Sequence, residues 1–120
     1  MSYHVLIVSS NIILSKRIDI ILTMEGFTCL PILKGSEVLN LIMKHKFDAV
    51  LIDEKIEDEP VPEIIEMIRR VNKVTPIFVV TKSNDNDEFK IMEELGPSYF
   101  MNKSLISEVL PEKLKAMIEK

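Results

Sequence analysis

Short runs of aliphatic, mostly β-branched residues recur along this chain, and segments with helical spacing separate them. Three of these runs read VLIV, AVLI and IFVV, and each soon gives way to polar residues, which is typical of strands buried on both faces. Two weaker runs bring the number of predicted strands to five. Because parallel strands need crossover connections, this alternation predicts an α/β fold with a doubly wound five-stranded parallel sheet.

Proline and serine positions refine the bounds of these elements. Pro31 interrupts the second strand and therefore predicts an edge position for it. Ser36 is expected to cap the second helix, and the last helix is expected to begin at Pro111. Strands are predicted at 3–8, 27–33, 49–52, 77–80 and 98–101, and helices at 11–25, 36–45, 62–72, 87–95 and from 111 onwards.

Composition excludes several classes of protein. Lys and Arg number 15 against 19 Asp and Glu, and the net charge of −4 argues against direct nucleic-acid binding. The single cysteine, Cys29, cannot form an internal disulfide, and no Cys/His pattern indicates a zinc site. No apolar run is long enough to span a membrane, and the chain does not open on a signal-peptide pattern. We therefore expect one cytoplasmic domain, residues 1–120, without a membrane or nucleic-acid partner.

Polar side chains stand where the predicted strands end, which is where doubly wound sheets carry their functional sites. Asp53, Thr81 and Lys103 follow the third, fourth and fifth strands, and Ser9 and Ser10 follow the first. Taken singly, such residues are more often turn caps or solvated surface. Together, a carboxylate, a hydroxyl and an ammonium group at one edge of a sheet form a site suited to handling an anion.

A family resemblance rests on four segments: MSYHVLIVSSN at 1–11, FDAVLID at 47–53, TPIFVVT at 75–81 and GPSYFMNK at 96–103. Through these segments the whole chain resembles the receiver domains of response regulators in two-component signalling. The resemblance implies the (βα)5 flavodoxin-like receiver fold and a part in phosphorelay signal transduction, as a signalling protein and not an enzyme.

The resemblance also assigns roles to four residues. Asp53 is implied to be the phosphoacceptor, Thr81 to bind the phosphoryl oxygens, and Lys103 to pair with the acceptor or the phosphate. Phe100 occupies the position of the switch aromatic, whose movement alters the face made by the fourth helix, fifth strand and fifth helix. Alternation along the strand is expected to point Phe100 and Lys103 to different faces, although a packing role fits Phe100 equally well.

The chain departs from the family at the metal site. Ser9 and Ser10 stand where the family carries a pair of acids, and Mg²⁺ is usually anchored by carboxylates. We therefore assign no cofactor, allow only weak residual Mg²⁺ binding at Asp53, and expect weak or absent Mg²⁺-dependent phosphorylation. Lys55 and Lys82 are expected to modify the site by neutralising Asp53 and crowding access to it.

Two routes would restore phosphorylation. In the first, Glu54, Glu57 or Asn11 supplies a replacement metal ligand. In the second, Lys55 and Lys82 stand in for the charge of the metal, and a dedicated kinase phosphorylates Asp53.

Three functions remain open at this point. The chain is a phosphoacceptor receiver, a degenerate pseudo-receiver that acts as a phosphorylation-independent interaction module, or a flavodoxin-like binder of a flavin or nucleotide. The last is disfavoured, because the chain has only 3 glycines and no glycine-rich phosphate loop. The expected partners are a histidine kinase or other signalling protein and a downstream effector bound at the switch face, and a homodimer is compatible with the family.

Overall fold

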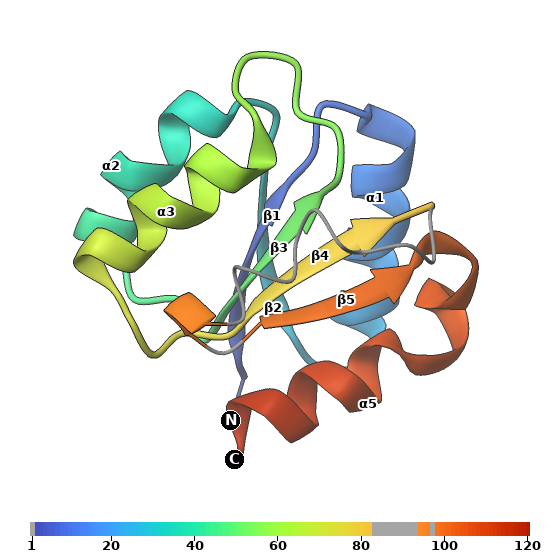
Figure 1. The fold of residues 1–120 in the computed structure, drawn as a ribbon. Helices are drawn as coiled ribbons and strands as arrows, with labels where there is room; N and C mark the ends of the chain where they lie inside the picture. The colour runs from blue at the N-terminus through green and yellow to red at the C-terminus, as the bar shows by residue number, and fades with distance from the viewer. Residues whose placement is uncertain (1, 83–93, 97) are drawn as a thin grey trace.

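The computed structural model describes residues 2–82, 94–96 and 98–120 and contains a parallel sheet with helices on both faces (Figure 1). The strands are β1 (His4–Val8), β2 (Thr28–Ile32), β3 (Ala49–Asp53), β4 (Ile77–Thr81) and β5 (Ser98–Asn102). They lie in the order β2-β1-β3-β4-β5, and every neighbouring pair is parallel. The predicted doubly wound fold is therefore confirmed, and so is the edge position of the strand that contains Pro31.

Figure 1 shows α2 and α3 on one face of the sheet and α1 and α5 on the other. Their bounds are α1 (Ile12–Met24), α2 (Val38–Lys44), α3 (Val61–Val71) and α5 (Ile106–Ile118). The helix predicted at 87–95 lies outside the described residues except at its last two positions. Within the described part of the chain, no helix has both the length and the apolar character needed to cross a membrane.

Alternating side chains of each strand feed two separate cores. In β3, Val50 and Ile52 pack with the residues of α2 and α3, whereas Ala49 and Leu51 pack with those of α1 and α5. This alternation follows from the period of two along a strand. The side of the sheet on which a polar side chain at the end of a strand lies is therefore set by this alternation.

The start of α2 differs from the prediction, because the Ser36 side chain does not cap it. A 3₁₀ turn, Gly35–Glu37, precedes the helix, and in neither element does the residue at the N-cap position supply a side-chain cap. Instead Asp58 accepts hydrogen bonds from the backbone N–H groups of Gly35, at 2.8 Å, and Ser36, at 3.0 Å. These bonds hold the pKa of Asp58 below its ordinary value, the one from Gly35 contributing most. Asp58 lies 22 residues beyond Ser36, so local sequence does not reveal this cap.

The start of α5 also differs from the prediction. The helix begins at Ile106, after a 3₁₀ turn at Lys103–Leu105, and Pro111 lies inside it. An interior proline has no N–H to donate and costs a helix about 3 kcal/mol. Ile106, Leu110 and Leu114 nevertheless form a stripe that is fully buried against the sheet. Burial of this stripe outweighs the lost hydrogen bond, so the helix starts before the proline.

Gly35 provides a test of how tightly the α2–α3 layer packs. A Cβ atom at this position would lie 2.6 Å from Cδ1 of Ile64, a fully buried side chain, and 3.3 Å from Cβ of Glu59. We expect Gly35→Ala to lower the free energy of unfolding by about 1–3 kcal/mol, measured by urea denaturation. Ser36→Ala, at the exposed neighbouring position, should change it by less than about 0.5 kcal/mol. Equal midpoints for the two variants would contradict this packing.

Candidate functional site

Asp53 ends β3 as a buried acid with partners on both carboxylate oxygens. Its exposed fraction is 2%. Nζ of Lys103 lies 2.9 Å from Oδ1, and the hydroxyl of Ser9 donates to Oδ2 at 3.0 Å. The backbone N–H of Lys55 also points at Oδ1, at 3.4 Å. The carboxylate is therefore neutralised by one lysine and fixed in orientation by two further donors.

Lys103 reaches Asp53 from the far side of a neighbouring strand. It follows β5, and β4 lies between β5 and β3 in the sheet. The side-chain oxygen of Asn102 accepts the backbone N–H of Ser104 at 2.9 Å and so caps the 3₁₀ turn that begins at Lys103. The long lysine stem then carries the ammonium group across the end of β4, leaving 18% of the side chain exposed.

Thr81 ends β4 on the other face of the sheet from Asp53. It follows Ile77 and Val79, which pack with α2 and α3. Glu54 has the same parity as its strand neighbour Ile52 and faces the same side. The Thr81 hydroxyl accordingly donates to Oε2 of Glu54 at 2.7 Å. Its implied role, binding phosphoryl oxygens, stays a prediction, and in this structure its proton is committed to Glu54.

Glu54, one of the three residues suggested from the sequence as a replacement metal ligand, makes several contacts in this site. Besides Thr81 it accepts the backbone N–H of Lys82 at 3.0 Å, and Nζ of Lys103 lies 3.7 Å from its Oε1. Burial alone would raise the pKa of Glu54. The hydrogen bonds from Thr81 and Lys82 and the charges of Lys103 and Lys55 outweigh burial and bring the pKa below its ordinary value of 4.5. The alternation of side chains along β3 and β4 would have predicted that Glu54 and Thr81 lie on the same side of the sheet.

The two serines after β1 hold loops together. The hydroxyl of Ser9 is fully buried, and besides contacting Asp53 it accepts the backbone N–H of Asn11 at 3.1 Å. The hydroxyl of Ser10 donates to the carbonyl of Leu33 and accepts the backbone N–H of Glu57, both at 3.0 Å. Ser10 thus ties the loop after β1 to the loops after β2 and β3, which are brought together at the carboxyl end of the sheet.

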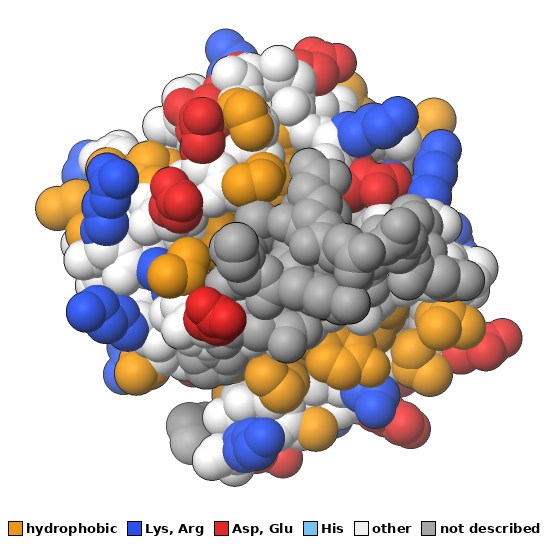
Figure 2. All heavy atoms as spheres, viewed as in Figure 1, with side chains coloured by type: hydrophobic (Ala, Val, Ile, Leu, Met, Phe, Trp, Pro, Cys, Tyr) orange, Lys and Arg blue, Asp and Glu red, His pale blue; other side chains and the backbone are white. Residues whose placement is uncertain are grey.

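A cleft of about 360 Å³ opens over Asp53. Arg17, which the sequence analysis did not single out, lines it from α1 and donates to the hydroxyl of Ser107 in α5 at 2.9 Å. The position of Arg17, early in the helix that follows Ser9 and Ser10, was the available signal. In Figure 2, basic and acidic side chains lie next to one another at the edge of the molecule toward which β3 and β4 point. The charged lining residues are Arg17, Lys55, Lys82, Lys103, Asp53 and Glu57, four bases and two acids.

Comparison with known proteins decides the family. The model of the response regulator receiver domain matches residues 5–115. This chain belongs to the response regulator receiver family. Receiver domains are signalling domains that interact with kinases and effector domains, and this receiver therefore belongs to two-component signalling.

Relatives of this receiver agree with its family. It is 29% identical over 121 residues to "Probable transcriptional regulator ycf29" of Porphyra purpurea, a match that covers 98% of this chain and 57% of the relative. A putative response regulator from Chloroflexus aurantiacus has the same fold with a TM-score of 0.89, 21% identity and full coverage of both chains. A two-component response regulator from Clostridium difficile gives a TM-score of 0.89 at 20% identity, covering 99% of this chain and 98% of that one.

The donor set of this receiver does not match the ligands that Mg²⁺ prefers. Magnesium is usually held by carboxylates in an octahedral oxygen shell. Here an ammonium group lies 2.9 Å from Asp53, and the serine hydroxyls are hydrogen-bonded within the protein. Asn11 uses its side-chain oxygen to cap α1, accepting the N–H of Leu14 at 3.1 Å. Among the described residues, no three His, Cys, Asp or Glu side chains are grouped to hold a metal ion.

Phe100 of the receiver is half-buried and packs against the core formed with α2 and α3. Lys103 lies past the end of β5, in the 3₁₀ turn, so strand alternation does not set its direction as the sequence analysis assumed. The neighbours of Phe100 follow the alternation, because Tyr99 and Met101 pack on the opposite face. This packing accounts for Phe100 in this structure, and its switch role stays a prediction.

The ion pair between Lys103 and Asp53 should contribute measurably to the free energy of unfolding. Lys103→Met leaves the carboxylate of Asp53 buried without its counter-charge, and we expect a loss of about 3 kcal/mol in the free energy of unfolding. In the double variant with Asp53→Asn most of this loss should be recovered, because a neutral amide needs no counter-charge. Urea denaturation of the parent, both single variants and the double variant measures the coupling. Lys82→Met, at an exposed side chain, is the matched control, and a Lys103→Met variant as stable as this control would contradict the prediction.

The hydrogen bond from Thr81 to Glu54 should make the stability of the fold depend on pH through the pKa of Glu54. Because the pKa of Glu54 is lowered in the folded state, ionised Glu54 stabilises the fold above its unfolded pKa, and this contribution is lost as the pH falls through the folded value. Thr81→Val removes the donor hydroxyl, so we expect the pKa of Glu54 to rise toward 4.5. Carbon-detected NMR titration of the Glu54 carboxyl group measures it. Thr23→Val, which removes a hydroxyl that donates to Asp19, should leave that titration unchanged.

Proposed function

We propose that this receiver works in two-component signalling with Asp53 held in an ion pair, and that its Mg²⁺-dependent phosphorylation is weak or absent. The observation that carries the proposal is the contact of Ser9, which stands in the place of one of the family's acids and donates to the second oxygen of Asp53 at 3.0 Å. The Lys103 contact, at 2.9 Å on the first oxygen, is the one that the resemblance to receivers already implies. The hydroxyl of Ser9 fixes the orientation of the carboxylate but carries no negative charge with which to anchor a divalent ion beside it.

Phosphoryl transfer needs the developing charge on the transferred group to be neutralised, and a bound metal usually supplies most of that charge. In the part of the chain that the structure describes, only the ammonium group of Lys103 forms an ion pair with Asp53, and the acid pair that would anchor a divalent ion is replaced by Ser9 and Ser10. The Thr81 hydroxyl would have to leave Glu54 before it could donate to a phosphoryl oxygen. Three parts of the reaction are thus weakened together.

A receiver of this kind acts by presenting surfaces to other proteins. We propose a histidine kinase or other signalling protein as its upstream partner, and an effector bound at the predicted switch face, of which the structure describes β5 and α5. The relative from Porphyra purpurea is named a probable transcriptional regulator, which supports a transcriptional output for that effector. The net charge of −4 supports contact through protein and not directly with nucleic acid, and cytoplasmic location follows from this role.

A second candidate function rests on the lining of the cleft. Arg17, Lys55 and Lys82 place positive charge around Asp53 in addition to Lys103. Such charges would replace part of the neutralisation that a metal provides, and a dedicated kinase would then phosphorylate Asp53 without bound Mg²⁺. This function predicts a phosphoacceptor that ignores small phosphodonors.

Intact-mass measurement after incubation with acetyl phosphate and Mg²⁺ tests the first proposal. We expect no phosphate adduct on this receiver, while an ordinary receiver in the same buffer acquires one. Ser9→Asp/Ser10→Asp, and Ser10→Asp alone in case the buried position does not accept an acid, should gain Mg²⁺-dependent phosphorylation. An adduct on the parent that Asp53→Asn abolishes would refute the proposal.

A phosphorylated histidine kinase as donor tests the second candidate in the same assay. An adduct formed only with the kinase, and lost in Lys55→Ala/Lys82→Ala, would support phosphorylation with lysine in place of the metal. An adduct that survives in that double variant would exclude this mechanism.

A further inference from the structure

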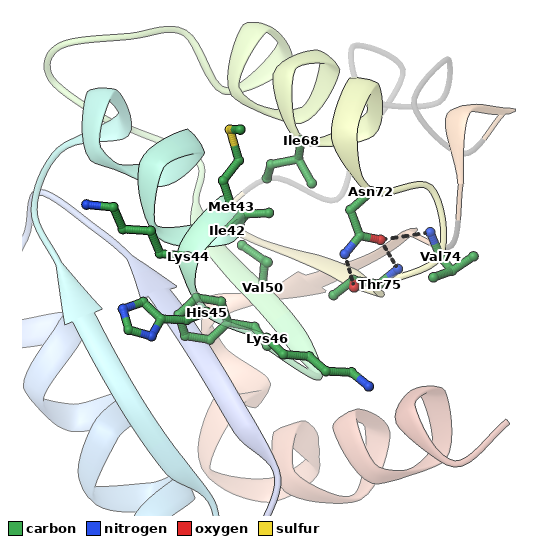
Figure 3. Close-up of a pocket in the computed structure, with 11 residues that line it drawn as sticks. Ile42, Met43, Lys44, His45, Lys46, Val50, Ile68, Asn72, Val74 and Thr75 are labelled. Carbon is green, nitrogen blue, oxygen red and sulfur yellow. Dashed lines mark hydrogen bonds between the residues drawn. The ribbon is translucent and has the colours of Figure 1, made fainter.

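A second cavity, of about 380 Å³, lies at the end of the sheet opposite Asp53 (Figure 3). Its lining comes from the last turn of α2, the segment 45–47, Val50 in β3, Ile68 in α3, and the loop between α3 and β4. These segments precede β3 and β4, whereas Asp53 ends β3. A molecule bound in this cavity would therefore leave the cleft over Asp53 open.

The floor of the cavity is apolar and its lips carry exposed apolar side chains. Ile68 and Val50, at 0% and 1% exposure, form the buried part of the lining. Met43 on α2 is 69% exposed and Val74 on the opposite loop is 78% exposed. A volume at the lower end of the range for ligand pockets, about 300–1,000 Å³, is suited to one or two side chains of a partner. Met43 adds a side chain that adapts to different shapes.

The rim of the cavity is basic. Lys44, His45 and Lys46 are all exposed and contribute to the lining, and none of the lining residues that the structure describes is an acid. In Figure 3, Lys44 and Lys46 extend to opposite sides of the segment that joins α2 to β3. The chain as a whole has more acids than bases, 19 against 15, and this rim is opposite in sign to that balance. An anionic partner therefore fits the rim by charge complementarity.

The side of the cavity opposite α2 is the loop of residues 72–75, and hydrogen bonds within this loop already order it. The side-chain oxygen of Asn72 accepts the backbone N–H groups of Val74, at 3.1 Å, and Thr75, at 3.0 Å, and its amide nitrogen donates to the Thr75 hydroxyl. The buried Arg69 guanidinium donates to the carbonyl of Thr75 at 2.7 Å. Figure 3 shows the hydrogen bonds of Asn72 beside the cavity. A preformed lip reduces the ordering that a partner would otherwise have to impose on binding.

From these features we propose that the cavity docks a peptide segment of a partner protein, in which an aliphatic or aromatic side chain is flanked by carboxylates. The apolar side chain fills the space between Met43 and Val74 over Ile68, and the carboxylates face Lys44 and Lys46. The apolar floor favours a peptide over nucleic acid, whose binding rests mainly on phosphate contacts. This docking site is independent of phosphorylation at Asp53.

Peptide selection tests the proposal even though the partner is unidentified. A library of random short peptides is displayed on phage and selected on the immobilised chain, and the affinities of enriched peptides are measured by fluorescence polarisation. Lys46→Glu and Val74→Asp alter the rim and the lip. Lys16→Glu and Ile13→Asp are matched controls, because both are exposed residues of α1 on the other face of the sheet. Circular dichroism checks that each variant is folded.

We expect the enriched peptides to place Asp or Glu around Leu, Ile, Met or Phe. Each cavity variant should weaken binding at least about tenfold, each control by less than about twofold, and added salt should weaken binding further. Asp53→Asn should leave the affinity unchanged.

Four outcomes would overturn the proposal. The first is a lack of enrichment, and the second is enrichment of peptides without acids. The third is binding that survives in both cavity variants. The fourth is a different occupant, shown either by an oligonucleotide that displaces the peptides or by self-association of the chain that Val74→Asp abolishes.

Discussion

A carboxylate buried at the end of a parallel sheet requires a counter-charge, and in this receiver Lys103 provides it to Asp53. The arrangement of the surrounding elements serves that contact. Asn102 caps the turn that starts at Lys103, and Ser9 holds the second carboxylate oxygen from β1. Three strand ends are therefore coupled through one ion pair, which makes the carboxyl edge of the sheet a single electrostatic unit.

Lys103 also lies within reach of Glu54, so this unit contains two acids served by one lysine. Glu54 has further donors in Thr81 and the backbone of Lys82, and these keep it ionised at a pH where an isolated glutamate begins to take up protons. The hydroxyl that receivers are expected to direct at a phosphoryl group is thereby retained by a neighbouring carboxylate. Among the residues that the structure describes, the polar groups of the site are therefore partnered mainly by one another.

The sequence was sufficient to predict the alternation of strands and helices, because hydrophobic periodicity is a local property. It also brought Asp53 and Lys103 together correctly, since the carboxyl ends of parallel strands must meet. It failed where a distant residue replaced a local one, as when Asp58 took the capping role expected of Ser36. It failed again at Pro111, where burial of a helical stripe outweighed the local preference of one residue. The partner of Thr81 was readable in principle from strand parity, but only once the end of each strand was fixed to the residue.

The edge strand β2 has a consequence for assembly. Pro31 lies in register with Ile7 of β1, and it has no N–H to offer on either side of its strand. Side chains of β2 such as Leu30, 40% exposed, are accessible, but the backbone cannot present an uninterrupted row of donors to an incoming strand. Continuous growth of the sheet from this edge is thus blocked. A partner that binds at this edge therefore contacts side chains, and such contacts are specific and reversible. Pairing through the backbone, which is open to any extended polypeptide, is disfavoured there.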